Sequence, residues 1–236
     1  MDFNTGGGSG RSDDRPLFGG EAGEPTGGPT RGPVGGPGGE FNLQDPVNSF
    51  IGTVRSLVLN PVGFFRGIPR QGNFVNPLVF VVICALVNGI LGGIIGFFIS
   101  VATRTRGFGG AFVSLISGII FTPIGAVIGL FIGAAIYYLL VLLLVRPNAG
   151  FEATFRVVSY ASVGQLISWI PIIGWIIGPI WGIVLSILGI REVHTTTTGR
   201  AAAVVLIPVV VILLLVFLLV VLIGAALFVG SQQQFQ

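Results

Sequence analysis

The chain has 236 residues, of which 52% are hydrophobic and only 9% are charged. Soluble globular domains carry about 25% charged residues, so this composition excludes an ordinary soluble domain and predicts an integral membrane protein. The twelve basic residues are all arginine and form no dense basic patch. We therefore expect no nucleic-acid partner, in spite of a sequence pI of 9.8.

No catalytic or metal site is expected. The chain has one cysteine, Cys84, and one histidine, His194, whereas a structural zinc site takes four such ligands. No nucleophile with a neighbouring base and no cofactor motif stands out along the sequence. We expect no catalytic residue, no metal and no cofactor, and we predict that the chain is not an enzyme.

Residues 1–44 are predicted to form a disordered cytoplasmic tail. Fourteen glycines and five prolines fall within residues 1–39. Such a segment buries too little surface to offset the entropy of ordering its backbone, about 1 to 2 kcal/mol per residue. A tail that folds on contact with a partner is the alternative.

Residues 45–75 are predicted to lie at the membrane surface. Asp45 is suited to cap a helix and Pro46 to open it. Six apolar residues then follow at helical spacing, namely Val47, Phe50, Ile51, Val54, Leu57 and Val58. This stripe predicts an amphipathic helix that lies in the headgroup layer or packs against the ends of the spans.

Five membrane crossings are predicted between residues 76 and 230, since each needs about 20 mostly apolar residues. Their ranges are 77–101, 111–145, 151–170, 171–190 and 201–229. The second range would extend about 52 Å as one helix. It is either a tilted helix kinked near Pro123 or a short interfacial piece followed by a span. Residues 151–190 form either two short crossings or a re-entrant hairpin.

The arginines predict the orientation. Five crossings put six arginines on the N-terminal side (Arg66, Arg70, Arg146, Arg156, Arg191 and Arg200) and two on the other (Arg104 and Arg106). Because cytoplasmic loops are enriched in basic residues, we expect a multi-pass protein of the cytoplasmic (inner) membrane with a cytoplasmic N-terminus and an external C-terminus.

Few polar side chains fall near the spans. Glu152 and Arg156, four residues apart, are predicted to pair on one helix face, with Arg156 snorkelling to the headgroups. The interfacial candidates are Arg66, Arg70, Glu152, Arg156 and His194. At mid-depth the polar side chains are Asn88, Tyr160, Ser162 and Gln165, for which interhelical hydrogen bonding or a substrate path are the two interpretations.

Glycines at four-residue spacing predict close helix packing, because small residues let two backbones approach inside a membrane. The candidates are Gly89 and Gly93, then Gly125, Gly129 and Gly133, then Gly174, Gly178 and Gly182. A further pair is Gly92 and Gly96. We expect spans one, two and four to form the centre and the Leu/Val-rich fifth span to face lipid.

The order of several short motifs resembles the Yip family, the Ypt/Rab-interacting membrane proteins and their prokaryotic relatives. The motifs are Asn60-Pro61 with Phe64-Phe65, the proline-headed first span, the stretch from Phe155 to Tyr160, the turn at Pro171 and Gly174, and the segment Gly189 to His194. The resemblance covers residues 46–229. It implies a five-span membrane domain, here residues 76–230, with a cytoplasmic N-terminus and a short tail over 231–236.

The resemblance implies vesicle trafficking through Rab partners only for the eukaryotic members of the family. Nothing in the Gly-rich tail of this chain supports such a role here. We expect a non-enzymatic membrane-organising or protein-interaction module. The alternative is a small-molecule or ion transporter, which needs polar groups around a mid-membrane cavity or half-helices aimed at a substrate. The expected partners are the lipid bilayer and either another membrane protein or further copies in a homo-oligomer.

Overall fold

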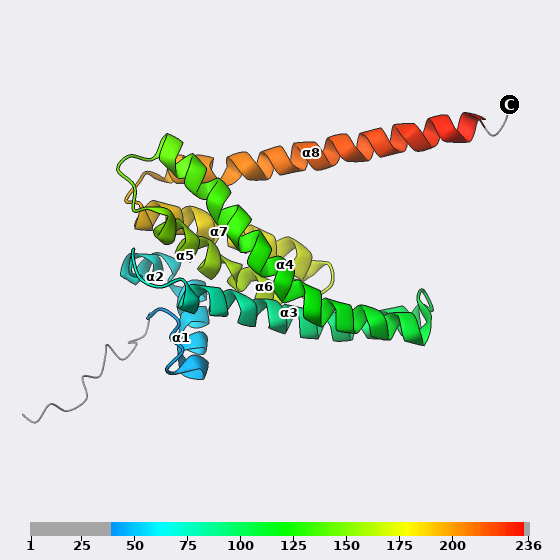
Figure 1. Cartoon of the computed structure of the whole chain (residues 1–236), viewed down its shortest axis with the longest axis horizontal. Coiled ribbons are helices and arrows are strands. Elements are labelled where there is room, and N and C mark those ends of the chain that lie inside the picture. Colours follow the sequence, from blue (N-terminus) through cyan, green and yellow to red (C-terminus); the bar gives the residue numbers. More distant parts are fainter. Residues whose placement is uncertain (1–38, 234–236) are drawn as a thin grey trace, which may run out of the picture. The chain divides into compact units, whose positions relative to one another are not determined.

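The computed structural model describes residues 39–233 and, within them, contains helices and no strand. The helices in chain order are α1 (Pro46–Leu59), α2 (Pro61–Gly67), α3 (Val75–Ala102), α4 (Gly107–Leu144), α5 (Phe151–Ala161), the 3₁₀ turn η1 (Ser162–Gly164), α6 (Gln165–Ser168), α7 (Ile173–Val193) and α8 (Thr198–Gln233) (Figure 1). The predicted all-α class is confirmed. Of the predicted tail, residues 1–38 lie outside the described part, as do residues 234–236.

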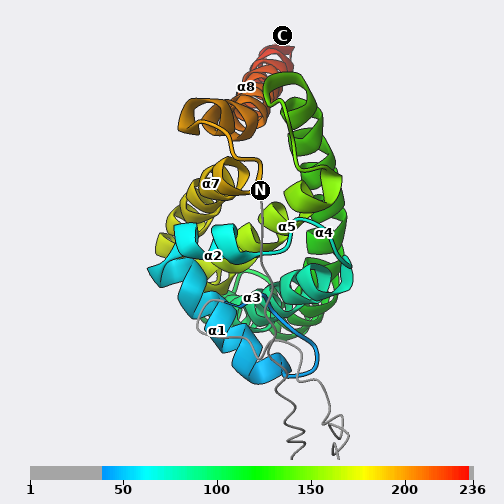
Figure 2. The same cartoon turned by 90° about the vertical axis from the view of Figure 1, so that its left-hand side faces the viewer.

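Helices α1 and α2 lie at the end of the bundle where α3 begins, and α1 runs across α3 rather than along it (Figures 1 and 2). Asn60 ends α1 and starts α2, since its side-chain oxygen accepts a hydrogen bond from the Gly63 N–H at 3.0 Å and Pro61 opens the helix. Asp45 does not cap α1 as expected. Its carboxylate accepts hydrogen bonds from the Asn48 side chain instead.

The predicted apolar stripe of α1 is divided between two surroundings. Leu57 is buried and Phe50 and Val54 pack against the core, whereas Val47, Ile51 and Val58 are between 51% and 67% exposed. The apolar residues predicted to share one environment are therefore divided between the protein core and the outer surface. The exposed residues form a ridge on the outer side of α1, which we call the α1 ridge.

Helices α3 and α4 form a long antiparallel hairpin and pack along each other (Figure 1). α4 is one helix of 38 residues with Pro123 inside it, which matches the first of the two alternatives for this range. At 1.5 Å per residue it extends about 57 Å. It is thus longer than a hydrocarbon core of about 30 Å.

The third predicted crossing, 151–170, is wrong as a single helix. It is broken into α5, η1 and α6, and the described residues contain four helices, rather than five, that are long and apolar enough to cross a membrane: α3, α4, α7 and the first part of α8. The break lies at a close helix contact. A β-carbon at Gly164 would collide with the backbone of Gly178 on α7, so the 3₁₀ turn coincides with a close approach to α7.

Helix α7 packs on α5, α6 and α2, and α8 contacts α7 and α4. The contact of α8 is confined to its beginning, where Ala201, Val204 and Val205 are buried. From Val210 to Ala225 every residue is exposed. The bulky Leu/Val surface in this range is the one predicted to face lipid. The helix also continues to Gln233, beyond the predicted end of the span.

Candidate functional site

A buried arginine lies in the middle of α5, at the end of the bundle that carries α1 and α2. Arg156 is only 3% exposed. Its guanidinium forms an ion pair with the Glu40 carboxylate, donates to the backbone oxygen of Asn73 at 2.9 Å and contacts Glu152 at 3.4 Å. The predicted pairing of Glu152 with Arg156 is present, but the predicted snorkelling is wrong, because Arg156 points into the protein rather than to the headgroups.

Glu40 comes from the segment that precedes α1. Its Oε1 atom accepts a hydrogen bond from the Tyr160 hydroxyl at 2.9 Å as well as from Arg156. Burial raises the pKa of the Glu40 carboxyl, and the nearby Arg156 guanidinium opposes that rise. In such a site, the ion pair and hydrogen bonds offset the free-energy cost of removing the carboxylate from water.

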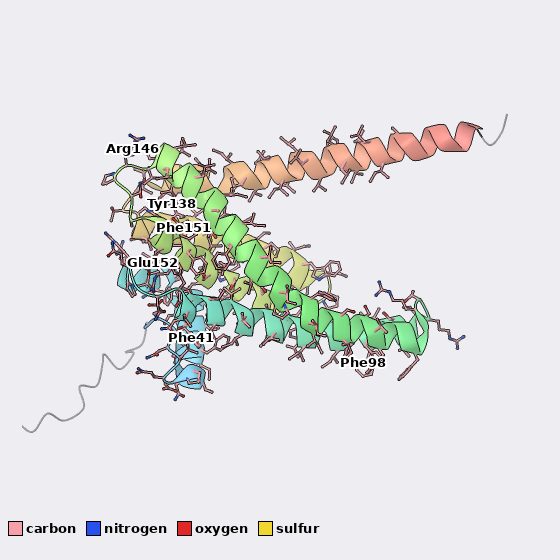
Figure 3. All side chains as sticks on the ribbon, in the orientation of Figure 1. Phe41, Phe98, Tyr138, Arg146, Phe151 and Glu152 are labelled. Carbon is pink, nitrogen blue, oxygen red and sulfur yellow. The ribbon has the colours of Figure 1, made fainter. Side chains whose placement is uncertain are left out.

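The segment around Glu40 is a described part of the fold, although it falls within the predicted disordered tail. We call residues 39–42 the strap. The Phe41 side chain is fully buried, with ring centroids 6.5 Å from Phe50 and 6.1 Å from Phe80. Figure 3 shows Phe41 where α1 meets α3. The prediction of disorder is therefore wrong for residues 39–44, because one aromatic side chain and one ion pair anchor them.

His194 forms a second buried polar cluster at the end of α7. Its Nδ1 atom accepts a hydrogen bond from the Ala149 N–H at 3.0 Å, so the proton resides on Nε2, which lies 3.0 Å from Thr154 Oγ1. The Thr154 hydroxyl in turn donates to the Gly150 oxygen at 3.3 Å. Burial, followed by the charge of Arg70, lowers the pKa of His194 to about 4. The neutral imidazole thus ties the α4–α5 loop to α7.

The remaining interfacial candidates are at the same end. Arg66 is exposed and bonds Glu192 through Nε at 2.7 Å, and Arg191 bonds the same carboxylate. Arg70 is exposed. The contact of Arg66 with Glu192 joins α2 to α7. Among the described residues, no three His, Cys, Asp or Glu side chains gather as metal ligands.

The glycine candidates fall into two classes. Gly89 and Gly93 on α3 lie against the backbone of α4, and Gly174, Gly178 and Gly182 on α7 lie against α5, η1 or α6. Gly133 has only a loose neighbour, Val158, and Gly125 and Gly129 have no atom within 4 Å of an added β-carbon. The expected close contact at Gly125 and Gly129 is therefore absent within the described chain. The four-residue spacing does not say which face of α4 meets a neighbour.

A family model described as the Yip1 domain matches residues 55–230. The chain belongs to the Yip1 domain family. No curated protein and no solved structure matches the chain. The resemblance inferred from the motif order is thus confirmed, and Arg156, Tyr160 and His194 all lie inside the Yip1 domain.

Glu40 and Phe41 lie outside the matched range, N-terminal to the Yip1 domain. Neither residue was predicted as a site residue from the sequence, because the Gly/Pro-rich composition around them points to disorder. The available signal was weak: a large aromatic residue next to an acid, directly before an amphipathic helix. The observed site therefore combines a domain arginine with a carboxylate from the adjoining segment, a pairing across 116 positions.

Proposed function

We propose that this Yip1 domain protein is a non-enzymatic membrane-organising or protein-interaction module. The observation that carries the proposal is the placement of its charged side chains. Within the described spans, the acidic and basic residues are confined to the ends, as with Arg191 and Glu192 on α7 and Arg200 on α8. The buried Arg156 is engaged by two partly buried carboxylates, those of Glu40 and Glu152.

The interior of the spans supports the same proposal. The α3–α4 contact is made by Gly89 and Gly93 against backbone, and the contact of α6 with α7 by Gly174 and Gly178. Two backbones this close leave no room for water or a solute between them. Dry packing mediated by glycines suits a structural or interaction module. A transport path instead needs space for water or a solute between its helices.

The proposed location is the cytoplasmic (inner) membrane, with the N-terminus in the cytoplasm. Seven described arginines, Arg55 on α1 among them, belong to the end of the bundle that carries α1 and α2, and Arg104 and Arg106 to the loop at the other end of the α3–α4 hairpin. The positive-inside rule assigns the arginine-rich end to the cytoplasm. α1, lying across α3, would then rest in the inner headgroup layer on its exposed ridge.

One observation favours the transporter alternative. The third pass is discontinuous at η1, and broken helices at mid-depth often surround transported ions. Asn88 is opposite this break: its neighbours one turn away on α3, Cys84 and Gly92, lie by Ser162 and Trp169. Asn88 and Gln165 are half-buried amides at this level.

Cysteine accessibility separates the two functions. In a Cys84→Ser background the chain has no other thiol, so Asn88→Cys reports on water at mid-depth. We expect a charged, membrane-impermeant thiol reagent to leave this cysteine unlabelled in sealed vesicles of either orientation, while the exposed control Leu43→Cys reacts readily from the cytoplasmic side. Labelling at residue 88 would reveal an aqueous path and overturn the proposal.

Partner binding is tested by photo-crosslinking in native membranes. A photoreactive amino acid at Leu43 or Leu59, both exposed at the arginine-rich end, should give discrete adducts with a protein. The matched control is Leu214 on α8, which is 61% exposed and should yield lipid adducts only. Identical diffuse products at all three positions would contradict an interaction role at this end.

A further inference from the structure

The strap is bound to the Yip1 domain as a peptide ligand is bound to a receptor. Its backbone is held by hydroxyl groups of α1: Thr53 Oγ1 donates to the Gly39 oxygen at 3.2 Å. Ser49 accepts from the Asn42 N–H at 3.0 Å and donates to the Asn42 oxygen at 2.9 Å. Thr53 is fully buried beneath the strap. The inner side of α1 thus recognises an extended main chain.

The two strap side chains are recognised separately. The Glu40 carboxylate meets Arg156 and the Tyr160 hydroxyl. The Phe41 ring packs against Phe50 and Phe80, whose rings also contact each other, and Phe80 in turn lies 5.1 Å from the Tyr160 ring. An acid-binding position and an aromatic pocket therefore stand side by side. We call this arrangement the socket.

The socket has a hydrogen-bond donor that its present occupant does not use. The Arg156 Nε atom is buried and has no hydrogen-bond partner among the described residues. Arg156 and Tyr160 both bond the same oxygen of Glu40. Unused buried donors cost free energy, and burial raises the pKa of the Glu40 carboxyl. The strap is thus held by a contact that a better-matched carboxylate would improve.

We propose that the socket is a recognition site for extended acidic-aromatic segments, in which the strap is an internal occupant that exchanges with a Glu-Phe-like segment of a partner protein. This inference rests on the proposed function as an interaction module. The partner chemistry is given by the occupant: a carboxylate for Arg156, an adjacent aromatic ring for the Phe50–Phe80 pocket, and an extended main chain for the hydroxyls of Ser49 and Thr53.

A lipid phosphate fits the socket less well. Glu152 already lies 3.4 Å from the Arg156 guanidinium, so a phosphate with more than one negative charge would meet a second carboxylate at close range. The aromatic pocket would also stay empty, and a buried ring contributes much of the energy of such a contact. We therefore assign the socket to a protein segment rather than to a headgroup.

The covalent link makes the strap a strong competitor. A short tether gives an effective concentration in the millimolar range, so an external segment with micromolar intrinsic affinity is largely excluded while the strap is seated. The wild-type chain should accordingly bind an added peptide weakly. A variant whose strap cannot seat should bind it far more tightly, and this difference is the signature of the proposed exchange.

The test uses the full-length protein in detergent or nanodiscs and a fluorescent peptide of residues 37–44, with binding followed by anisotropy. The double variant Glu40→Gln/Phe41→Ala should bind the peptide at least tenfold more tightly than wild type. Adding Arg156→Gln to the double variant should abolish that gain. Glu40→Gln alone is isosteric and gentler on folding, and it should give at least a threefold gain.

Three results would overturn the inference. One is equal peptide affinity of wild type and both strap variants. Another is equal binding of a control peptide in which alanine replaces the phenylalanine. The third is full displacement of the peptide by micromolar inorganic phosphate or by vesicles rich in anionic lipid, which would make the socket a phosphate site. None of these depends on the labelling of Asn88→Cys, so failure of the socket and failure of the proposed function are distinguishable.

Discussion

Gly89 on α3 faces the carbonyl oxygen of Gly118 on α4 so closely that a β-carbon at Gly89 would lie 3.0 Å from that oxygen. No side chain separates the two helices at this point. The relationship locates the tightest approach of the α3–α4 hairpin, and it identifies the glycine whose replacement the fold tolerates least along α3.

Gly89→Leu is expected to destabilise the protein by about 1 to 3 kcal/mol, the usual cost of forcing a larger side chain into a packed site. The measurement is the melting temperature in detergent. Gly129→Leu is the matched control, since a β-carbon at Gly129 meets nothing within 4 Å, and it should leave the melting temperature nearly unchanged. Equal losses in the two variants would refute the assignment of the contact to Gly89.

Removing Arg156 should be far more damaging than removing Arg66. Arg156→Leu leaves the Glu40 carboxylate partly buried without its cation, which typically costs about 3 to 5 kcal/mol. Arg66 is 68% exposed in its pair with Glu192, and exposed pairs contribute about 0 to 1 kcal/mol. Chemical denaturation of both variants in mixed micelles makes the comparison. Comparable small losses would show that the Arg156 cluster contributes little to stability.

Acidification should weaken the fold through His194. Its pKa is lowered from 6.5 to about 4 in the folded chain, so between these values the unfolded state binds more protons and stability falls as pH falls. The full shift corresponds to a loss on the order of 3 kcal/mol, complete near pH 4 and absent above about pH 6.5.

His194→Gln is the control for this effect, because it removes the titrating group. Glu40 contributes with the opposite sign, since burial raises its pKa and acid then favours the folded state. That contribution is present in both proteins. The difference in stability between wild type and His194→Gln should therefore shrink steadily from pH 7 to pH 4.5, and a constant difference would exclude His194 as the source.

The two termini should report opposite sides of the membrane. α5, η1 and α6 together cover residues 151–168, which extends about 27 Å and nearly matches a hydrocarbon core of about 30 Å. Although it is broken, we expect this segment to complete a fifth pass between α4 and α7. Reporter fusions at Met1 and after Gln236 measure the outcome, and two cytoplasmic reports would mean that residues 151–168 do not cross.

A label on the turn before α7 tells a crossing from a re-entrant hairpin. Ile172 is 75% exposed, and Ile172→Cys in the Cys84→Ser background should react with an impermeant reagent added from outside. Protection from both sides would place the turn inside the bilayer and support the hairpin.

The α1 ridge should be immersed in lipid. A nitroxide attached at Ile51→Cys is expected to collide more often with oxygen, which concentrates in lipid, than with a water-soluble nickel complex, because the ridge is apolar and α1 lies across the spans. Ser56→Cys, on another side of α1, should show the reverse preference. Nickel accessibility at residue 51 equal to that at residue 56 would place the ridge in water or under a partner.

The hydropathy and arginine patterns predicted the membrane class and the four long spans. Burial in lipid is a property of a whole segment, so these predictions do not depend on how individual residues pack. The patterns did not predict the break at η1. That break lies where Gly164 closely approaches Gly178, a contact that exists only once the two helices are packed. For the same reason, spacing alone placed Gly129 and Gly89 in one class, although only Gly89 meets a neighbouring backbone.

The site was less predictable than the fold. The pair of Glu152 and Arg156 could be inferred, since both belong to one helix and four-residue spacing brings them together. The pair of Glu40 and Arg156 could not, because a contact between distant positions leaves no periodic trace in a single sequence. The Gly/Pro-rich composition before Glu40 pointed to disorder, and one buried ring at Phe41 was enough to reverse it.

The distance along the chain between Glu40 and Arg156 also sets an order of events during synthesis. The strap leaves the ribosome before α3 and α4, whereas its arginine is made 116 residues later, after both helices. At about 5 to 20 residues per second, the strap waits on the order of 6 to 23 seconds without its cation. The α3–α4 hairpin, whose partners are adjacent in sequence, needs no such wait. The strap is therefore translated before α3 and α4 but completes its contacts after them, and throughout that interval the Glu40 carboxylate lacks its cation.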